Sequence, residues 1–223
     1  MNIIVPAITQ IVLPMKKTLI HITDEHFIAS GGFSDCYRHP DINDQCIKIQ
    51  STSKKANKRL RKELAYYKKL HDSQSNLRYV ADYFGTCQTN LGIGYTYQCV
   101  LDDDGTVSKT LEYCLENKIL EPEVFLKELH QMAIHLLNNR ILVCDVHAKN
   151  ILIQRVEGSA PKPILIDGIG EKIAITVLNS IPSVVENKII RRWNRFADLL
   201  VEKHPEIQTL LQECRLSKND IVA

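Results

Sequence analysis

The stretch from Asp145 to Gly168 constrains the fold of this chain more than any other part of its sequence. Two short apolar runs, 151–153 and 164–166, flank a polar segment, 157–163, that contains Gly, Pro and Lys. Apolar runs separated by turn-forming residues predict two strands joined as a hairpin. In an antiparallel pair the start of the first strand lies beside the end of the second. We therefore expect Asn150 and Asp167 to meet at the open end of the hairpin, with Asp145 shortly upstream.

The polar residues at this end of the hairpin carry groups suited to one kind of chemistry. Asp145 supplies a carboxylate that can orient a substrate hydroxyl and accept its proton. Asn150 and Asp167 supply the hard oxygen ligands that Mg²⁺ takes together with phosphate groups. His147 lies two residues after Asp145 and either hydrogen-bonds within the loop or faces a substrate. The pattern predicts a site for proton transfer and Mg²⁺–phosphate binding, with Asp145 and His147 as candidate catalytic residues.

The rest of the chain divides into a β-rich first part and a mostly helical second part. Apolar residues at steps of four, three and four predict helices at 121–139 and 183–203 in the second part. The change of pattern predicts an N-terminal extension at 1–18, a first unit at 19–101 and a second unit at 102–223, in an α+β fold. In the first unit, one helix is expected at 54–71 and strands are expected at 19–22, 27–29, 34–38, 45–49, 80–86 and 93–101.

One acidic residue stands out in the basic helix 54–71. This helix has eight Lys or Arg residues and a single acid, Glu63, which falls on its apolar stripe. A carboxylate that faces a core needs a cation to meet it. Lys48 alternates with apolar neighbours in a predicted strand, so we expect it to pair with Glu63 and to be directed toward nucleotide phosphates. The alternative is that Glu63 bonds a neighbouring Lys in solvent.

Two adjacent glycines, Gly31 and Gly32, stand between two predicted strands. Such a pair lets the backbone approach a phosphate closely and exposes N–H groups to it. Gly-Gly is also an ordinary hairpin turn. The order of the Gly pair, the strand Lys, the helix Glu and the D-x-x-x-x-N motif favours the phosphate interpretation.

Composition argues against several other classes of protein. The net charge of +2 does not indicate nucleic-acid binding, and we expect no nucleic-acid partner, although the basic helix 54–71 leaves that alternative open. The seven cysteines form no C-x-x-C pair, which predicts free thiols in a reducing compartment. The apolar run 2–13 is short for a membrane span and no basic residue precedes it. We expect a cytoplasmic protein without a membrane span.

These residues resemble the protein-kinase-like superfamily. The loop D-V-H-A-K-N-I-L has a His two residues after its Asp, as in the aminoglycoside and choline phosphotransferase branch. More specifically, the chain is similar to the bacterial YrbL family, described as proteins of the PhoP regulatory network, over roughly residues 28–200. The motifs that carry this similarity are G-G-F-S-D-C-Y-R-H-P, C-I-K-I, R-K-E-L-A-Y-Y, G-T-x-x-T-N-L-G-I-G-Y-T-Y, D-D-G-T-V-S-K-T-L, K-N-I-L and D-G-I-G-E.

The resemblance implies a protein-kinase-like two-lobed fold with a β-rich N-lobe and a reduced helical C-lobe. It implies ATP and Mg²⁺ as cofactors. Gly31, Gly32, Lys48 and Glu63 would bind the nucleotide, Asn150 and Asp167 would bind the metal, and Asp145 would act as the base.

The chain departs from standard protein kinases around this loop. Val143 and Cys144 stand where a His and an Arg usually precede the catalytic Asp, and Gly168 follows Asp167 directly. Only 56 residues follow Asp167, so we expect the platform for protein substrates to be missing. The leading hypothesis is phosphotransfer from ATP to a hydroxyl of an unknown small-molecule or protein substrate. The alternative is a pseudokinase that binds a nucleotide or a partner without turnover.

Overall fold

A computed structural model describes residues 19–171 and 181–221 of the chain. The described part is a mixed α+β structure with one six-stranded sheet, one three-stranded sheet and several helices, so the predicted α+β class is confirmed. The predicted N-terminal extension, 1–18, lies outside the described residues. Within those residues, no helix has the length and apolar character needed to cross a membrane.

The larger sheet contains the strands of the first part of the chain in the order β1-β5-β6-β4-β3-β2. Its neighbouring strands are antiparallel, except that β1 and β5 are parallel. Helix α1, Lys54–Asp72, follows β4 and begins after Ser53, whose side chain accepts a hydrogen bond from the Ala56 N–H. The strands are β1 Leu19–Ile20, β2 Phe27–Ser30, β3 Ser34–Arg38, β4 Gln45–Gln50, β5 Tyr83–Thr89 and β6 Gly92–Gln98.

Five of the six predicted strands differ from the prediction at one end or both, two of them by three residues. The strand expected at 80–86 begins only at Tyr83, because Val80 and Ala81 pair with the other sheet instead. Val80 makes an isolated parallel bridge to Leu165, and the Ala81 N–H donates to the Leu165 carbonyl. The strand expected at 93–101 runs from Gly92 to Gln98.

The smaller sheet has the order β7-β8-β9 and contains the predicted hairpin. Ile151 pairs with Leu165 across it, which brings Asn150 beside the end of β9 as expected. The strands are β7 Lys109–Thr110, β8 Ile151–Gln154 and β9 Lys162–Leu165. The helices of this part are α2 Leu111–Glu116, α3 Pro122–Asn138, α4 Pro182–Lys203 and α5 Gln208–Glu213. Short 3-10 helices span Asp24–His26, Ala148–Asn150, Pro205–Ile207 and Lys218–Asp220.

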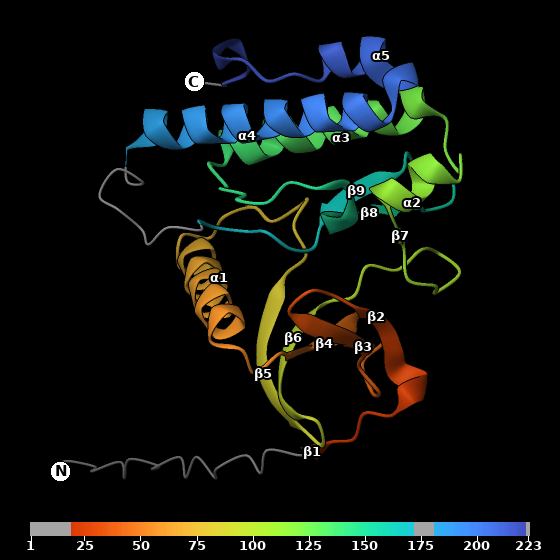
Figure 1. Cartoon of the computed structure of the whole chain (residues 1–223), viewed down its shortest axis with the longest axis vertical. Helices are drawn as coiled ribbons and strands as arrows, with labels where there is room; N and C mark the ends of the chain where they lie inside the picture. The colour runs from red at the N-terminus through yellow and green to blue at the C-terminus, as the bar shows by residue number, and fades with distance from the viewer. Residues whose placement is uncertain (1–18, 172–180, 222–223) are drawn as a thin grey trace, which may run out of the picture.

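Figure 1 shows the larger sheet and α1 at one end of the molecule and α3, α4 and α5 at the other, with the smaller sheet between them. The apolar stripes predicted for α3 and α4 are buried: Phe125, Leu129, Met132 and Leu136 on one helix, Ile189, Trp193, Phe196 and Leu200 on the other. One main cluster of buried side chains continues from these helices to Tyr67 and Tyr97 in the first part. The two ends of the molecule therefore share a core.

A buried carboxylate fixes the segment that connects the two parts. The Asp102 side chain accepts hydrogen bonds from the Ser108 hydroxyl at 2.6 Å and from the Arg155 backbone N–H at 2.9 Å. The Arg155 guanidinium also binds it, at 2.8 and 2.5 Å. Because Arg155 directly follows β8, Asp102 ties the connection to the hairpin. The boundary at 101/102 stays a prediction.

Candidate functional site

A cavity of about 810 Å³ opens between the larger sheet and the hairpin. This volume lies in the range of small-molecule sites. Every site residue predicted from the sequence lines it: Gly31, Gly32, Lys48, Glu63, Asp145, His147, Asn150 and Asp167. Residues from the larger sheet, from α1 and from the hairpin thus meet in one place.

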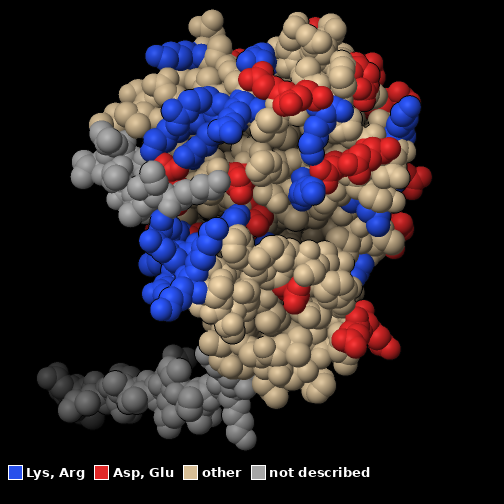
Figure 2. Space-filling model, viewed as in Figure 1, with Lys and Arg blue, Asp and Glu red and all other residues tan. Residues whose placement is uncertain are grey.

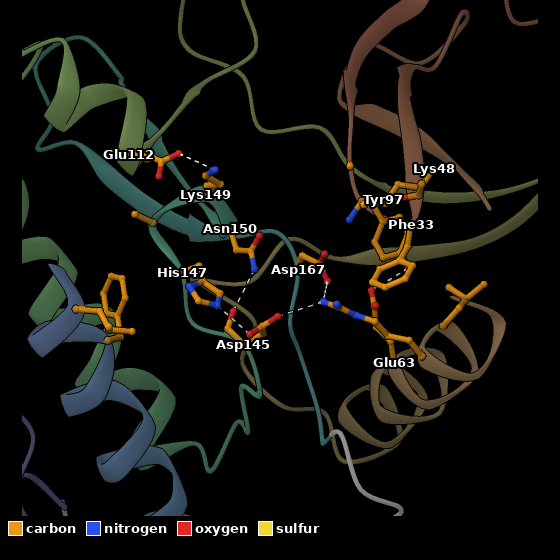
Figure 3. A pocket seen from close by; sticks show the side chains of 18 of the residues that line it. Phe33, Lys48, Glu63, Tyr97, Glu112, Asp145, His147, Lys149, Asn150 and Asp167 are labelled. Atoms are coloured by element: carbon orange, nitrogen blue, oxygen red, sulfur yellow. Dashed lines mark hydrogen bonds and ion pairs between the residues drawn. The ribbon is translucent and has the colours of Figure 1, made fainter. Parts of the chain in front are cut away.

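Asp145, Asn150 and Asp167 point toward one space at the open end of the hairpin (Figure 3). The Asn150 amide donates to the Asp145 carbonyl at 3.1 Å, and the Ile166 N–H donates to the Asn150 carbonyl at 2.9 Å. His147 Nε2 lies 3.0 Å from Asp145 Oδ1, so the histidine contacts the candidate base directly. These contacts hold the loop against the end of β9.

Gly168 is required where it stands. Its φ is +80°, which disfavours other residues, and a Cβ there would lie 2.7 Å from the Asp145 carbonyl oxygen. Its N–H donates to Asp167 Oδ1 at 2.5 Å. The Gly after Asp167 therefore lets the two aspartate segments approach closely and orients the Asp167 carboxylate.

Lys48 and Glu63 approach the same ring rather than each other. The Lys48 ammonium donates to the Ile166 carbonyl at 2.9 Å and stands 4.5 Å from the centre of the Tyr97 ring. Glu63 accepts a hydrogen bond from the Tyr97 hydroxyl at 3.1 Å. Both residues are described, and no direct ion pair forms between them, so Tyr97 links the lysine to the glutamate.

The electrostatics of this pair follow from burial and from neighbouring charges. Burial lowers the pKa of Lys48, but the nearby carboxylates of Asp167 and Glu63 offset it, and the net pKa is raised. Burial raises the pKa of Glu63, against the opposing effects of Lys48 and of the Tyr97 hydroxyl. Lys48 is therefore held in its charged form, next to a cavity that also contains Asp167.

The two glycines form the tip of the β2–β3 hairpin. The Gly31 N–H donates to the Ser34 carbonyl at 2.8 Å, and a Cβ on Gly31 would lie only 3.2 Å from that oxygen. A Cβ on Gly32 would meet nothing within 4 Å. The tip thus places a backbone with little side-chain bulk at the edge of the cavity.

Arg59 is a site residue that the sequence reasoning missed. Its guanidinium lies 3.2 Å from Asp167 Oδ1 and 3.7 Å from Asp145 Oδ2, so one cation spans both aspartates. Burial lowers the pKa of Arg59, but Asp167 and Asp145 outweigh this effect and raise it. The available signal was its position four residues before Glu63, at the edge of the apolar stripe.

Tyr66 attaches α1 to the chain that leads into Asp145. Its buried hydroxyl accepts the Leu142 N–H at 2.7 Å and donates to the Arg140 carbonyl at 3.5 Å. Its ring packs so closely on Gly170 that a Cβ there would lie 3.1 Å from it. Helix α1 therefore contacts the segments on both sides of the hairpin.

The side chains at the open end of the hairpin suit Mg²⁺ only if phosphate groups supply most of its ligands. Among the described residues, no group of three or more His, Cys, Asp or Glu side chains is arranged to hold a metal ion by itself. Asp167 and Asn150 bring one carboxylate and one amide oxygen to the cavity. Mg²⁺ bound through phosphates needs only one or two protein ligands. The residues fit a metal that enters with a nucleotide, in the place that the Arg59 cation now borders.

Comparison with known proteins identifies the family. The family model described as PhoP regulatory network protein YrbL matches residues 20–200. The YrbL proteins of Escherichia coli (strain K12) and of Shigella flexneri are each 32% identical to the chain over 184 residues, which covers 80% of this chain and 86% of each relative. The chain therefore belongs to the YrbL family of PhoP regulatory network proteins.

Proposed function

We propose that this YrbL family member is an ATP- and Mg²⁺-dependent phosphotransferase with the two-lobed arrangement of kinases, acting on a hydroxyl of a small-molecule or protein substrate. The observation that carries the proposal is the convergence of all eight predicted residues on one cavity. A chance D-x-x-x-x-N motif has no reason to face a half-buried strand lysine and a Gly-Gly turn.

Each residue has a role that its surroundings support. Lys48, held charged between the Ile166 carbonyl and Tyr97, contacts the nucleotide phosphates. The Gly31-Gly32 turn lets the phosphates approach the backbone closely, while the Gly31 N–H stays bonded to the Ser34 carbonyl. Asp145 orients the acceptor hydroxyl and takes its proton as the oxygen bonds to the terminal phosphorus and ADP leaves.

Two further features complete this role assignment. His147, 3.0 Å from Asp145 Oδ1, orients that carboxylate. Bound Mg²⁺ would neutralise phosphate charge, with Asn150 and Asp167 as its protein ligands. All seven cysteines are described and none forms a disulfide bond, which is in keeping with a cytoplasmic location.

The test is the release of ADP from ATP with Mg²⁺, with water and a low-molecular-weight metabolite extract as acceptors. Wild type is compared with Asp145→Ala, Asp167→Asn and the exposed control Asp41→Asn. General-base catalysis predicts that Asp145→Ala lowers kcat by about 10²-fold or more, while the control matches wild type. Equal turnover in all four proteins would refute phosphotransfer at this cavity.

A second function, a nucleotide-binding regulator without turnover, is favoured by Arg59. Its guanidinium neutralises both Asp145 and Asp167, the residues that proton transfer and metal binding require. Thermal unfolding with increasing ATP and Mg²⁺ separates the two functions, because a ligand that binds only the native state raises its stability. A saturable rise in Tm without ADP release supports the regulator. No rise in Tm contradicts both functions.

A further inference from the structure

A second cavity, of about 490 Å³, adjoins the candidate catalytic cavity. Phe33, Arg59 and Glu63 line both cavities, so the two share a wall. The remaining lining of the second cavity comes from the exposed side of α1 on one hand and from the hairpin's open end on the other: Lys55, Lys58, Lys62, Cys144, Gly168, Ile169 and Glu171. We call it the basic cavity.

One face of α1 gives the basic cavity its charge. Lys55, Lys58, Arg59 and Lys62 stand at helical spacings of three, one and three residues, which directs all four toward the same side. Figure 2 shows Lys and Arg side chains gathered over α1 on this face. The Lys55 ammonium and the Arg59 guanidinium both lie over the Phe33 ring, 5.7 and 5.6 Å from its centre. The cations thus border a common wall.

The acidic residues that line the basic cavity form no ion pair with Lys55 or Lys58. Glu171 is held by two cations from α4: Lys188 lies 2.6 Å away, and Arg192 also bonds it. The Glu63 carboxylate accepts the Tyr97 hydroxyl and has a raised pKa because of its burial. Lys55 and Lys58 form no ion pair with any other residue in the described ranges. These two lysines therefore bring to the cavity a positive charge that no ion pair of the described residues compensates.

We propose that the basic cavity is a second ligand site, which binds a small anion that carries a phosphate group. A phosphate takes several charge-assisted hydrogen bonds at once, which suits convergent Lys and Arg donors. The site goes beyond the phosphotransfer proposed above and does not depend on it. Arg59 connects the two cavities, because an anion in the basic cavity competes for this guanidinium with Asp145 and Asp167. A ligand in one cavity then changes the affinity of the other cavity for its own ligand, and by linkage the second ligand changes the affinity for the first by the same factor.

The test is thermal unfolding of the full chain with increasing orthophosphate, with chloride used to keep ionic strength constant. Wild type is compared with Lys55→Gln/Lys58→Gln, which removes two exposed cations of the basic cavity. The matched control is Lys68→Gln/Lys69→Gln, on the same helix but lining neither cavity. We expect a saturable rise in Tm for wild type and for the control, and an apparent Kd at least about tenfold weaker for the first double variant.

Lys48→Met separates this site from the nucleotide cavity. Lys48 lines only the catalytic cavity, so orthophosphate should stabilise Lys48→Met as much as wild type. Loss of the effect in Lys48→Met would overturn the proposal, because the phosphate would then sit with the nucleotide residues. An equal loss in the Lys68/Lys69 control, or no saturable effect in wild type, would overturn it as well. Since ADP release does not enter this measurement, its outcome is independent of the activity test.

Discussion

Replacing Arg59 with Gln tests the most unexpected contact in the site. The substitution keeps much of the side-chain length and removes the cation that lies 3.2 Å from Asp167 and 3.7 Å from Asp145. Two opposite effects follow. The folded state loses two ion pairs, while the aspartates lose a competitor for any metal that enters with a nucleotide.

The stability effect is small because the three side chains are partly exposed, at 34% for Arg59, 22% for Asp145 and 38% for Asp167. At these distances each pair contributes about 1 kcal/mol in a water-like dielectric. Solvent screening and side-chain entropy reduce that value. We expect the free energy of unfolding to fall by about 1 kcal/mol in total, which lowers Tm by roughly 2–4 °C for a chain of this size.

The effect on metal binding has the opposite sign. An Mg²⁺ ion that no longer competes with Arg59 gains about 1 kcal/mol, so its apparent Kd in the presence of ATP should fall about fivefold. The assay is the Mg²⁺ concentration that gives half of the ATP-induced rise in Tm. Arg61→Gln, an exposed position on the same helix, is the control.

Either of two results would refute this reasoning. A loss of more than about 3 kcal/mol would mean that Arg59 acts as a buried structural ion rather than a screened one. An unchanged or higher Mg²⁺ requirement would mean that the guanidinium does not compete with the metal.

The other predictions concern stability, measured by urea unfolding. Asp102→Ala should cost about 1–3 kcal/mol, since it leaves the buried Ser108 hydroxyl without its partner while the exposed Arg155 guanidinium returns to water, whereas Asp104→Ala in the exposed turn should cost under about 1 kcal/mol; similar losses would contradict the role of burial. Gly94→Ala should cost about 1–3 kcal/mol, because the added Cβ would lie 2.5 Å from a methyl group of the buried Ile47. Gly32→Ala is the control: its Cβ would meet nothing within 4 Å, and it should cost under about 1 kcal/mol. Equal costs for the two variants would count against the clash. The raised pKa of Glu63 means that the folded state keeps its proton to higher pH than the unfolded state, so this group's contribution to stability is greatest below about pH 4.3 and falls as pH rises through the folded pKa. Glu63→Gln should therefore gain stability relative to wild type as the pH rises above about 4.3, and a difference independent of pH would contradict the shift.

The parts of the fold that could be predicted were those with a local signal. The apolar spacing of α3 and α4 and the turn between two apolar runs depend on residues close in sequence, and they are confirmed. The ends of β5 could not be read this way. Val80 belongs by composition to a strand, but its partner is Leu165 in the other sheet, which no local pattern records.

The same distinction applies to the candidate site. Lys48 was placed on the correct face by strand alternation, yet its contacts, the Ile166 carbonyl and the Tyr97 ring, come from residues far along the chain. Arg59 was hidden among the eight basic residues of the predicted helix, because no local pattern distinguishes one of these cations from another. Only the packing of α1 against the hairpin distinguishes it from its neighbours.

The attachment of α1 through Tyr66 determines how fast this site can change state. Swinging α1 outward would break the buried bond from the Leu142 N–H to the Tyr66 hydroxyl and separate the ring from Gly170. Collective movements of whole helices take microseconds to milliseconds, whereas rotamer changes of partly exposed side chains take picoseconds to nanoseconds. With its helix anchored in this way, we expect Arg59 to exchange between partners by rotamer changes alone, so that its response to a ligand would need no slow conformational step.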